Sequence, residues 1–338
     1  MARSPHDGAG VGARGRAAAA DAVLRSRDLR RGHRARPVSA LCGGIETGGT
    51  WTVCALAAGP EEIVAEEEFP TTSPEETLER IFAFFEAPGR PRPAAIGIGA
   101  FGPVDLNPAS PTWGHVTTCP KPGWQGAALG PGVRDRFRLP VAFDTDVNAA
   151  ALGEHGWGAG RGCGTLAYLT VGTGVGVGLL HGDRPWHGLI HPEAGHLRVP
   201  RHADDDFAGN CPRHGDCWEG MASGSALAER WGSDPAALPD DHPAWAIEVE
   251  YLAQGIYAVI CVASPERFVV SGGVILGRSG LLPRVRARVS ELNAGYLGSP
   301  RLGEQIDHYL VAPELGDRAG VLGAVALAQS LGGEGTET

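Results

Sequence analysis

Short apolar runs separated by glycine turns dominate the chain from residue 43 to residue 70 and predict β-strands. Residues 43–58 contain a strand, a glycine turn and a second strand, and residues 61–69 predict a third. The segment Ser73-Pro74-Glu75-Glu76 predicts a helix start, because Ser suits the N-cap, Pro the first turn and acids the positive end of the helix dipole. The apolar face of this helix recurs at helical spacing and comprises Leu78, Ile81, Phe82 and Phe85.

Two further strands and another helix complete the first half of the chain. Residues 94–100 consist of Ala, Ile and Gly and predict a buried strand. Residues 141–144 predict a short strand that leads into a helix starting at Asp146. With a further helix expected between these two strands, the order is β-β-β-α-β-α-β-α, which predicts an α/β domain that we assign to residues 41–160.

The second half, residues 161–338, opens with the same pattern of strand, Gly/Thr turn and strand within residues 165–180. The glycines at 172, 174, 176 and 178 have a period of two, so in a strand they would share one face and admit another backbone or a ligand. Two halves that open alike predict an internally duplicated α/β fold with a cleft between the halves. The later elements predicted are helices at 220–231 and 244–263, strands at 267–270 and 308–311, and a helix from about 316 to 331.

Composition and charge narrow the class of protein. Glycine accounts for 51 of the 338 residues, about twice its average usage. Residues 1–40 carry nine Arg and three Asp, and we expect a disordered extension there, without the apolar region of a signal peptide. Because the net charge is −10 despite this basic segment, the body is acidic, which argues against nucleic-acid binding. With no run of about 18 apolar residues to suggest a membrane helix, we expect a cytoplasmic protein.

A cluster of metal-binding residue types lies in the middle of the chain. Cys211, His214 and Cys217 recur at intervals of three, so a tight loop can turn all of them toward one point. Zinc prefers four N or S ligands at tetrahedral angles, and either His196 or His202 could supply the fourth. A disulfide between the two cysteines, or two core thiols, are the alternatives, and the lack of a secretory signal argues against the disulfide. The other five cysteines are expected to be small buried hydrophobic residues.

Two carboxylates bracket this cluster within residues 191–220. Glu193 precedes it and Glu219 follows it, so a loop fixed by a metal would hold two hydrogen-bond acceptors side by side. Such an arrangement suits the binding of a polyhydroxy ligand.

The two Gly/Thr turns have the composition of a phosphate clamp. Bare glycine backbone lets N–H groups approach phosphate oxygens, and a Thr hydroxyl adds a donor. Neither turn has the Walker pattern, and most Gly-Thr turns are only turns, but two on matching hairpins strengthen the interpretation. The residues concerned are Gly48, Gly49 and Thr50 in the first turn and Gly172, Thr173 and Gly174 in the second.

Asp146 is the candidate general base. It follows a strand and begins a helix, and ligands of α/β sheets bind at the carboxyl ends of strands. A carboxylate there could take the proton of a hydroxyl that attacks phosphorus, although a helix N-cap is an equally plain explanation. Asp144 is expected to support it or to face a metal. The loop that contains His115, Lys121 and Trp124 is expected to line the same cleft, with core packing or a rigid turn as the alternative.

Seven segments in order along residues 43–331 resemble the ROK family of bacterial sugar kinases, and specifically its fructokinase branch. The most specific are His-Pro-Glu-Ala-Gly-His (191–196) and Cys-Pro-Arg-His-Gly-Asp-Cys-Trp-Glu-Gly (211–220). The others are Gly-Gly-Ile-Glu-Thr-Gly-Gly-Thr (43–50), Gly-Ala-Phe-Gly-Pro-Val-Asp (99–105), Thr-Thr-Cys-Pro-Lys-Pro-Gly-Trp (117–124), Asp-Thr-Asp-Val-Asn-Ala-Ala-Ala-Leu-Gly-Glu (144–154) and Val-Gly-Thr-Gly-Val-Gly-Val-Gly (171–178).

This resemblance implies the duplicated ribonuclease-H-like fold of the actin and hexokinase superfamily, with two domains around a central cleft. It implies phosphorylation of fructose at O6 by ATP with Mg²⁺, Asp146 as general base, a structural Zn²⁺, and a homodimer. The residues it assigns to sugar are Gly102, Glu193, His196 and Glu219, and those it assigns to zinc are His196, Cys211, His214 and Cys217. Those it assigns to ATP are Gly48, Gly49, Thr50, Gly172, Thr173 and Gly174 at the phosphates and Gly272, Gly273 and Val274 near the adenine.

The chain departs from the family pattern at a few positions. Trp51 stands where members commonly have Lys after the first turn, so ATP affinity or rate could suffer. Ser271 replaces one glycine near the adenine, and Glu46 stands where the wider family often has Asp. The alternatives within the family are a kinase for mannose or glucose and a sugar-responsive transcription regulator, but paired helices typical of a DNA-binding domain are not predicted in residues 1–40.

Overall fold

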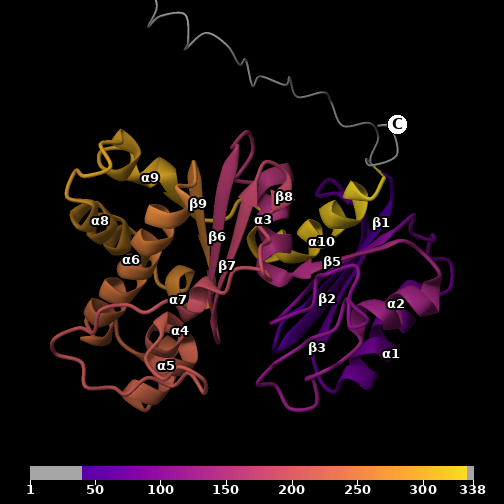
Figure 1. The fold of residues 1–338 in the computed structure, drawn as a ribbon, viewed down its shortest axis with the longest axis horizontal. Helices are drawn as coiled ribbons and strands as arrows, with labels where there is room; N and C mark the ends of the chain where they lie inside the picture. Colours follow the sequence, from indigo (N-terminus) through magenta and orange to yellow (C-terminus); the bar gives the residue numbers. More distant parts are fainter. Residues whose placement is uncertain (1–39, 333–338) are drawn as a thin grey trace, which may run out of the picture. The chain divides into compact units, whose positions relative to one another are not determined.

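The computed structural model describes residues 40–332, so the extension predicted at residues 1–40 lies outside the described residues except for its last residue. Two five-stranded sheets form the framework (Figure 1). The strands of the first sheet are β1 (Cys42–Thr47), β2 (Trp51–Gly59), β3 (Glu62–Pro70), β4 (Ile96–Ala100) and β5 (Val141–Thr145). Those of the second are β6 (Thr165–Val171), β7 (Val175–His181), β8 (Arg184–Pro185), β9 (Arg267–Ser271) and β10 (Leu310–Val311).

The two sheets have the same topology, which confirms the duplication. The first has the order β3-β2-β1-β4-β5, and the second, read in the same sense, has β8-β7-β6-β9-β10. In each sheet the first three strands in sequence pair antiparallel, and the last two join in parallel. Parallel neighbours need a crossover connection, and in both halves helices provide it.

Two helices lie between the sheets, α3 (Asp146–Trp157) and α10 (Ala319–Ser330). Helix α10 packs against α3, β1 and β4, so the end of the chain returns to the first sheet, where Figure 1 shows it in yellow beside the indigo strands. Helix α3 in turn packs against β6 and β7 of the second sheet. The assignment of residues 161–338 to a separate second domain therefore stays a prediction.

Glycines permit these helices to lie unusually close to their neighbours. A Cβ on Gly323 of α10 would lie 1.6 Å from the Ala149 carbonyl oxygen of α3, and a Cβ on Gly97 of β4 would lie 1.9 Å from that of Ala324. Gly178 of β7 faces the backbone of Val147 in the same way, at 2.3 Å. The periodic glycines of β7 therefore admit a helix backbone, as the sequence pattern predicted.

The remaining helices cover the outer faces of the two sheets. On the first sheet these are α1 (Pro74–Phe85) and α2 (Leu129–Phe137), whose apolar residues join a core with Ile96 and Ile98. On the second they are α4 (Trp218–Ala222), α5 (Gly224–Trp231), α6 (Ala244–Ala263), α7 (Gly273–Leu276), α8 (Leu281–Asn293) and α9 (Ile306–Tyr309). Helix α8 was not predicted, and the strand predicted at 308–311 is shorter because Ile306–Tyr309 is helical.

Among the described residues, one helix is long and apolar enough to cross a membrane by length and composition, namely α6. Most of its residues are buried, and it packs against α8 and α4 within the core of the second half. It also carries Glu248 and Glu250, so its hydrophobicity is explained by its position in the core.

Candidate active site

Asp146 is the first residue of α3, directly after β5. The cap of this helix is Thr145, whose hydroxyl accepts a hydrogen bond from the Asn148 N–H at 3.1 Å. The N-cap explanation for Asp146 is therefore wrong, and its carboxylate accepts the neighbouring Val147 N–H at 2.8 Å. Gly99 of β4 lets the helix start approach, since a Cβ there would lie 3.3 Å from the Asp146 Cα. The fold thus presents a half-buried carboxylate at the carboxyl ends of β4 and β5.

Three carboxyl groups lie close enough together to influence one another. Burial raises the pKa of Asp146 to about 6, although backbone N–H groups oppose this shift. Burial, and then the charge of Asp146, raises the pKa of Glu46 to about 8 and that of Glu193 to about 7. Raised pKa values of several neighbouring carboxyls are typical of functional sites, because each charge opposes ionisation of the next.

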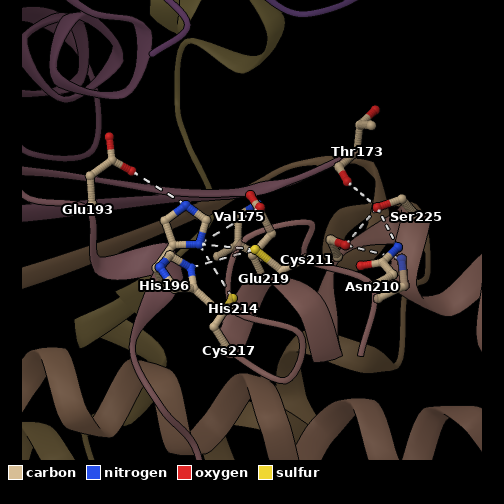
Figure 2. A network of polar contacts seen from close by, with 12 residues as sticks. Thr173, Val175, Glu193, His196, Asn210, Cys211, His214, Cys217, Glu219 and Ser225 are labelled. Atoms are coloured by element: carbon tan, nitrogen blue, oxygen red, sulfur yellow. Dashed lines mark hydrogen bonds and ion pairs between the residues drawn. The ribbon is translucent and has the colours of Figure 1, made fainter. Parts of the chain in front are cut away.

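Glu193, His196 and Glu219 lie together near Val175, at the start of β7. Nε2 of His196 lies 3.9 Å from Oε2 of Glu193, and its Nδ1 lies 4.0 Å from Oε1 of Glu219 (Figure 2). Glu219 also accepts the backbone N–H of Val175 at 3.1 Å, which holds it against the second Gly/Thr turn. These side chains offer several acceptors on one side of the site, and the binding of a polyhydroxy ligand by them stays a prediction.

Four N and S atoms converge next to this group. Nδ1 of His196 lies 3.4 Å from Cys217 Sγ and 3.8 Å from Cys211 Sγ, and Nδ1 of His214 lies 3.7 Å from Cys211 Sγ. One ligand atom from each of these residues lies within 4.8 Å of the others. The two cysteines are free thiols, and His202 instead accepts the Asp204 N–H, so the geometry selects His196 as the fourth member.

The second Gly/Thr turn is tied to the segment that carries these four residues. The Gly172 carbonyl accepts the Gly224 N–H at 2.7 Å, and the Thr173 carbonyl accepts the Ser225 hydroxyl at 2.9 Å. Asn210, next to Cys211, donates to the same Ser225 oxygen at 3.2 Å (Figure 2). The turn, the start of α5 and the His/Cys group therefore form one connected unit.

The first Gly/Thr turn is held by a different set of bonds, including one from the Thr71 N–H to the Thr50 carbonyl at 2.8 Å. Its Gly48 N–H donates to the Trp51 carbonyl at 2.8 Å, and its Gly49 carbonyl accepts Lys121 Nζ at 2.8 Å. Lys121, the only lysine of the chain, thus reaches the tip of this turn from the predicted loop. Trp51 stands half exposed on the first residue of β2.

The turn predicted near the adenine lies against the end of β6. Gly272 has a φ of 99°, and a Cβ there would lie 2.3 Å from the Val171 carbonyl, so a larger residue would be strained at this position. Gly273 faces open space, and Val274 packs near Gly224, whose Cβ would lie 3.3 Å from it. The structure therefore brings the second and third glycine turns together.

The three residues singled out in the loop of residues 115–124 have different surroundings. Trp124 is fully buried and donates to the Thr72 carbonyl at 2.7 Å, so its role is packing, which was the alternative interpretation. His115 contacts the Trp113 carbonyl at 3.3 Å. Of the three residues singled out in this loop, Lys121 is the one that reaches a predicted phosphate turn.

A protein-family model described as the ROK family matches residues 42–331. The chain belongs to the ROK family. The match covers both sheets, all three glycine turns and the His/Cys group, so it includes every element of the candidate site.

Among its relatives, this ROK protein is 43% identical to a fructokinase of Zymomonas mobilis over 298 residues, which cover 85% of this chain and 96% of the relative. It is 41% identical to a putative fructokinase of Bacillus subtilis over 288 residues, 85% of this chain and 95% of the relative. Among solved structures, a ROK hexokinase from Thermus thermophilus matches with a TM-score of 0.69 at 26% identity, covering 87% of this chain and 99% of that one.

A solved ROK glucokinase from Streptomyces griseus, in complex with glucose and AMPPNP, matches with a TM-score of 0.68 at 26% identity. It covers 86% of this chain and 99% of that chain. These matches confirm that this ROK protein has the actin/hexokinase-like ATPase fold expected from its sequence.

One contact of the site in this ROK protein was missed by the sequence reasoning. Asp144 is buried, accepts the side-chain amide of Asn148 at 2.7 Å, and lies 2.9 Å from Nε2 of His187. The hydrogen bond with Asp144 raises the pKa of His187, so this contact favours the protonated ring. The two residues lie far apart in sequence, and the alternation of the β5 strand indicated only which face Asp144 occupies.

Proposed function

We propose that this protein transfers the γ-phosphoryl group of MgATP to O6 of fructose. The observation that carries the proposal is the carboxylate of Asp146 at the start of α3, near Glu193 and Glu46, in a chain of the ROK family. Relatives named fructokinase, 35–43% identical over most of the chain, support fructose as the sugar.

Asp146 is suited to act as the general base. With a pKa of about 6 it is mainly ionised at neutral pH, yet basic enough to accept the proton of a sugar hydroxyl as that oxygen attacks phosphorus. Hydrogen bonds from the backbone N–H groups of Val147 and of Asp146 itself orient this carboxylate. Much of the remaining catalysis in phosphoryl transfer comes from positioning and electrostatic stabilisation.

Glu193, His196 and Glu219 are proposed to bind the sugar hydroxyls, together with the backbone at Gly102. The glycine turns are proposed to bind ATP, with Gly48, Gly49, Thr50, Gly172, Thr173 and Gly174 at the phosphates and Gly272, Gly273 and Val274 near the adenine. Their exposed N–H groups suit phosphate oxygens. Mg²⁺ bound with the nucleotide would neutralise part of the phosphate charge.

His196, Cys211, His214 and Cys217 are proposed to hold a structural Zn²⁺. Zinc bonds of about 2.0 Å to N and 2.3 Å to S at tetrahedral angles place neighbouring donors roughly 3.3–3.8 Å apart. The N–S separations of 3.4, 3.7 and 3.8 Å in the structure fit this spacing. When bound, zinc would fix the loop that carries Glu193 and Glu219, so that both carboxylates keep their positions before the sugar arrives.

The decisive experiment is an ADP-release assay with fructose, mannose, glucose and N-acetylmannosamine, followed by identification of the phosphorylated product. We expect the highest kcat/KM with fructose and fructose 6-phosphate as product. A higher kcat/KM with mannose or glucose would assign the protein to another hexose, and no turnover with any sugar would reject the kinase proposal.

We also propose a homodimer located in the cytoplasm, as the family resemblance implies. Light scattering during size-exclusion chromatography measures the mass of the particle directly. A mass near that of one 35.1 kDa chain at micromolar concentration would reject the dimer.

A further inference from the structure

His191 lies at a junction between the two halves of the molecule, and none of the roles described so far involves it. Its ring is buried, with 3% of the residue exposed. Both ring nitrogens have a partner: the backbone N–H of Val104 donates to Nε2 at 3.1 Å, and Nδ1 lies 3.2 Å from Oε1 of Glu193. Val104 belongs to the first half and Glu193 to the second, so one side chain joins both.

These two partners determine the tautomer of His191. A backbone N–H can only donate, so Nε2 must be the acceptor and the proton of the neutral ring must sit on Nδ1. Nδ1–H therefore donates to Oε1 of Glu193. Burial lowers the pKa of His191, in agreement with a neutral ring.

The contact with His191 engages one of the two carboxylate oxygens of Glu193. Its Oε1 is taken by His191, whereas its Oε2 lies 3.9 Å from Nε2 of His196, beyond hydrogen-bond distance. Oε2 therefore keeps its lone pairs for an incoming hydroxyl group. Because Oε1 is held by a buried ring, the direction in which Oε2 points is fixed as well.

On the other side, His191 contacts the turn that follows β4. A Cβ on Gly102 would lie 3.5 Å from Cε1 of His191, so the ring packs directly on this residue. Val104 is itself anchored by an isolated β-bridge to Val116, which gives the turn a fixed backbone. The imidazole is thus wedged between a rigid turn of the first half and the sugar-binding carboxylate of the second.

We propose that His191 is a positioning residue for the sugar: it orients the carboxylate of Glu193 and holds the Gly102 turn against the sugar-binding loop. The proposal rests on the proposed function and deepens it, because it names the residue through which one ligand of the sugar acquires its orientation. His191 itself would not touch the reacting atoms.

The two contacts of His191 can be removed separately with a matched pair of variants. An Asn side chain places its amide near the position of Nδ1 and can still donate to Glu193, whereas a Gln side chain reaches the position of Nε2 and can still accept from Val104. For His191→Gln we expect the KM for fructose to rise about tenfold with little change in the KM for ATP, since a buried hydrogen bond to a charged group is lost. For His191→Asn we expect a lower Tm and a KM for fructose within about threefold of wild type.

His155→Asn serves as the control, because His155 bonds only the Cys163 carbonyl, at 3.0 Å, near the end of α3. It should leave the KM for fructose unchanged. Zinc content and Tm are measured for every variant. Equal rises of KM in the Asn and Gln variants, an unchanged KM in the Gln variant, or parallel changes in fructose and ATP would overturn the role of His191, as would loss of folding in both. Wild-type protein inactive on every sugar would instead overturn the proposed function.

Discussion

The two Gly/Thr turns occupy equivalent places in duplicated sheets, yet their surroundings differ. The first, Gly48–Thr50, is bonded at its tip to Lys121 and through the Thr50 carbonyl to the Thr71 N–H, whereas the second is bonded to Gly224 and Ser225 of α5 and through Ser225 to Asn210 beside the His/Cys group. The second half also carries the segment 187–222 between β8 and α5, with the His/Cys group and two carboxylates. The duplicated sheets therefore carry similar turns, but the second half adds a segment that places the His/Cys group and two carboxylates beside its turn.

The residues before the turns differ as well. Glu46 stands two residues before the first turn, and Thr170 stands two residues before the second. The first half thus contributes Asp146, which is mainly ionised at neutral pH, and Glu46, whose raised pKa keeps it mainly protonated, while the second contributes the His/Cys group with Glu193 and Glu219 beside it. A kinase needs both, since charge development and substrate positioning are separate demands on the site.

The largest effect is expected at Asp146, in the first half. Asp146→Asn should lower kcat about 10²–10⁴-fold, because the amide keeps the shape but cannot accept the proton. Tm and zinc content should stay near wild type. The measurement is steady-state ADP release, with Asp135→Asn on the surface of α2 as the control. A kcat within threefold of wild type would remove Asp146 from the role of base.

The next largest effect is expected at the His/Cys group of the second half. Cys211→Ser should abolish stoichiometric zinc and lower Tm by several degrees, because a structural zinc site contributes folding free energy directly. The KM for fructose should rise with it, since Glu193 and Glu219 lose their support. Elemental analysis and thermal unfolding measure both, and Cys261→Ser is the control, because this thiol lies outside the group and is exposed rather than buried as its sequence context predicted. Full zinc content in the Cys211 variant would refute the ligand set.

Much of this site could be predicted because its signals are local in sequence. The glycine turns, the strand-to-helix position of Asp146 and the interval of three between Cys211, His214 and Cys217 all act over a few residues. Spacing alone left both His196 and His202 open as the fourth ligand, and only the family resemblance assigned His196. In the structure His196 lies with the other three, whereas His202 accepts the Asp204 N–H.

The elements that were missed depend on contacts between distant residues or on weak patterns. Helix α8 has buried Leu282, Val285 and Val289, but Arg residues alternate with them and weaken the helical pattern. The return of α10 to the first sheet depends on Gly97 and Gly323, whose significance appears only when the backbones meet. The Val104–His191 bond spans 87 residues, so its only local signal is the place of His191 two residues before Glu193.

At the first turn, Lys121→Met should raise the KM for ATP roughly 3- to 10-fold, because a charged donor near the phosphates is lost at a partly exposed site. Lys121→Arg should retain more of the affinity. Adding Trp51→Lys to the Lys121→Met variant places a cation on the same turn, and it should restore part of the affinity for ATP. An unchanged KM for ATP in the Met variant would mean that Lys121 only stabilises the turn through its bond to the Gly49 carbonyl and does not contribute to ATP binding.

At the second turn, Ser225→Ala removes the hydroxyl that bonds the Thr173 carbonyl. The expected rise in the KM for ATP is about two- to fivefold, since one neutral hydrogen bond contributes roughly 1 kcal/mol and the Gly224 bond remains. Ser290→Ala in α8 is a control distant in sequence from the turn. A larger effect here than at Lys121 would mean that rigidity of the second turn matters more than charge at the first.

The smallest effect concerns the dependence of stability on pH. Because the pKa of Glu46 is raised to about 8 in the folded protein, its protonated form favours folding, and this contribution is lost as pH rises through 8. Tm should therefore fall by a few degrees between pH 6 and pH 9, and Glu46→Gln should flatten that fall because the amide stays neutral. Thr170→Val, at the equivalent position of the second half, should leave the slope as in wild type. Thermal unfolding at closely spaced pH values measures the slope of Tm against pH for all three proteins. Equal slopes for wild type and Glu46→Gln would mean that Glu46 does not cause the pH dependence of stability.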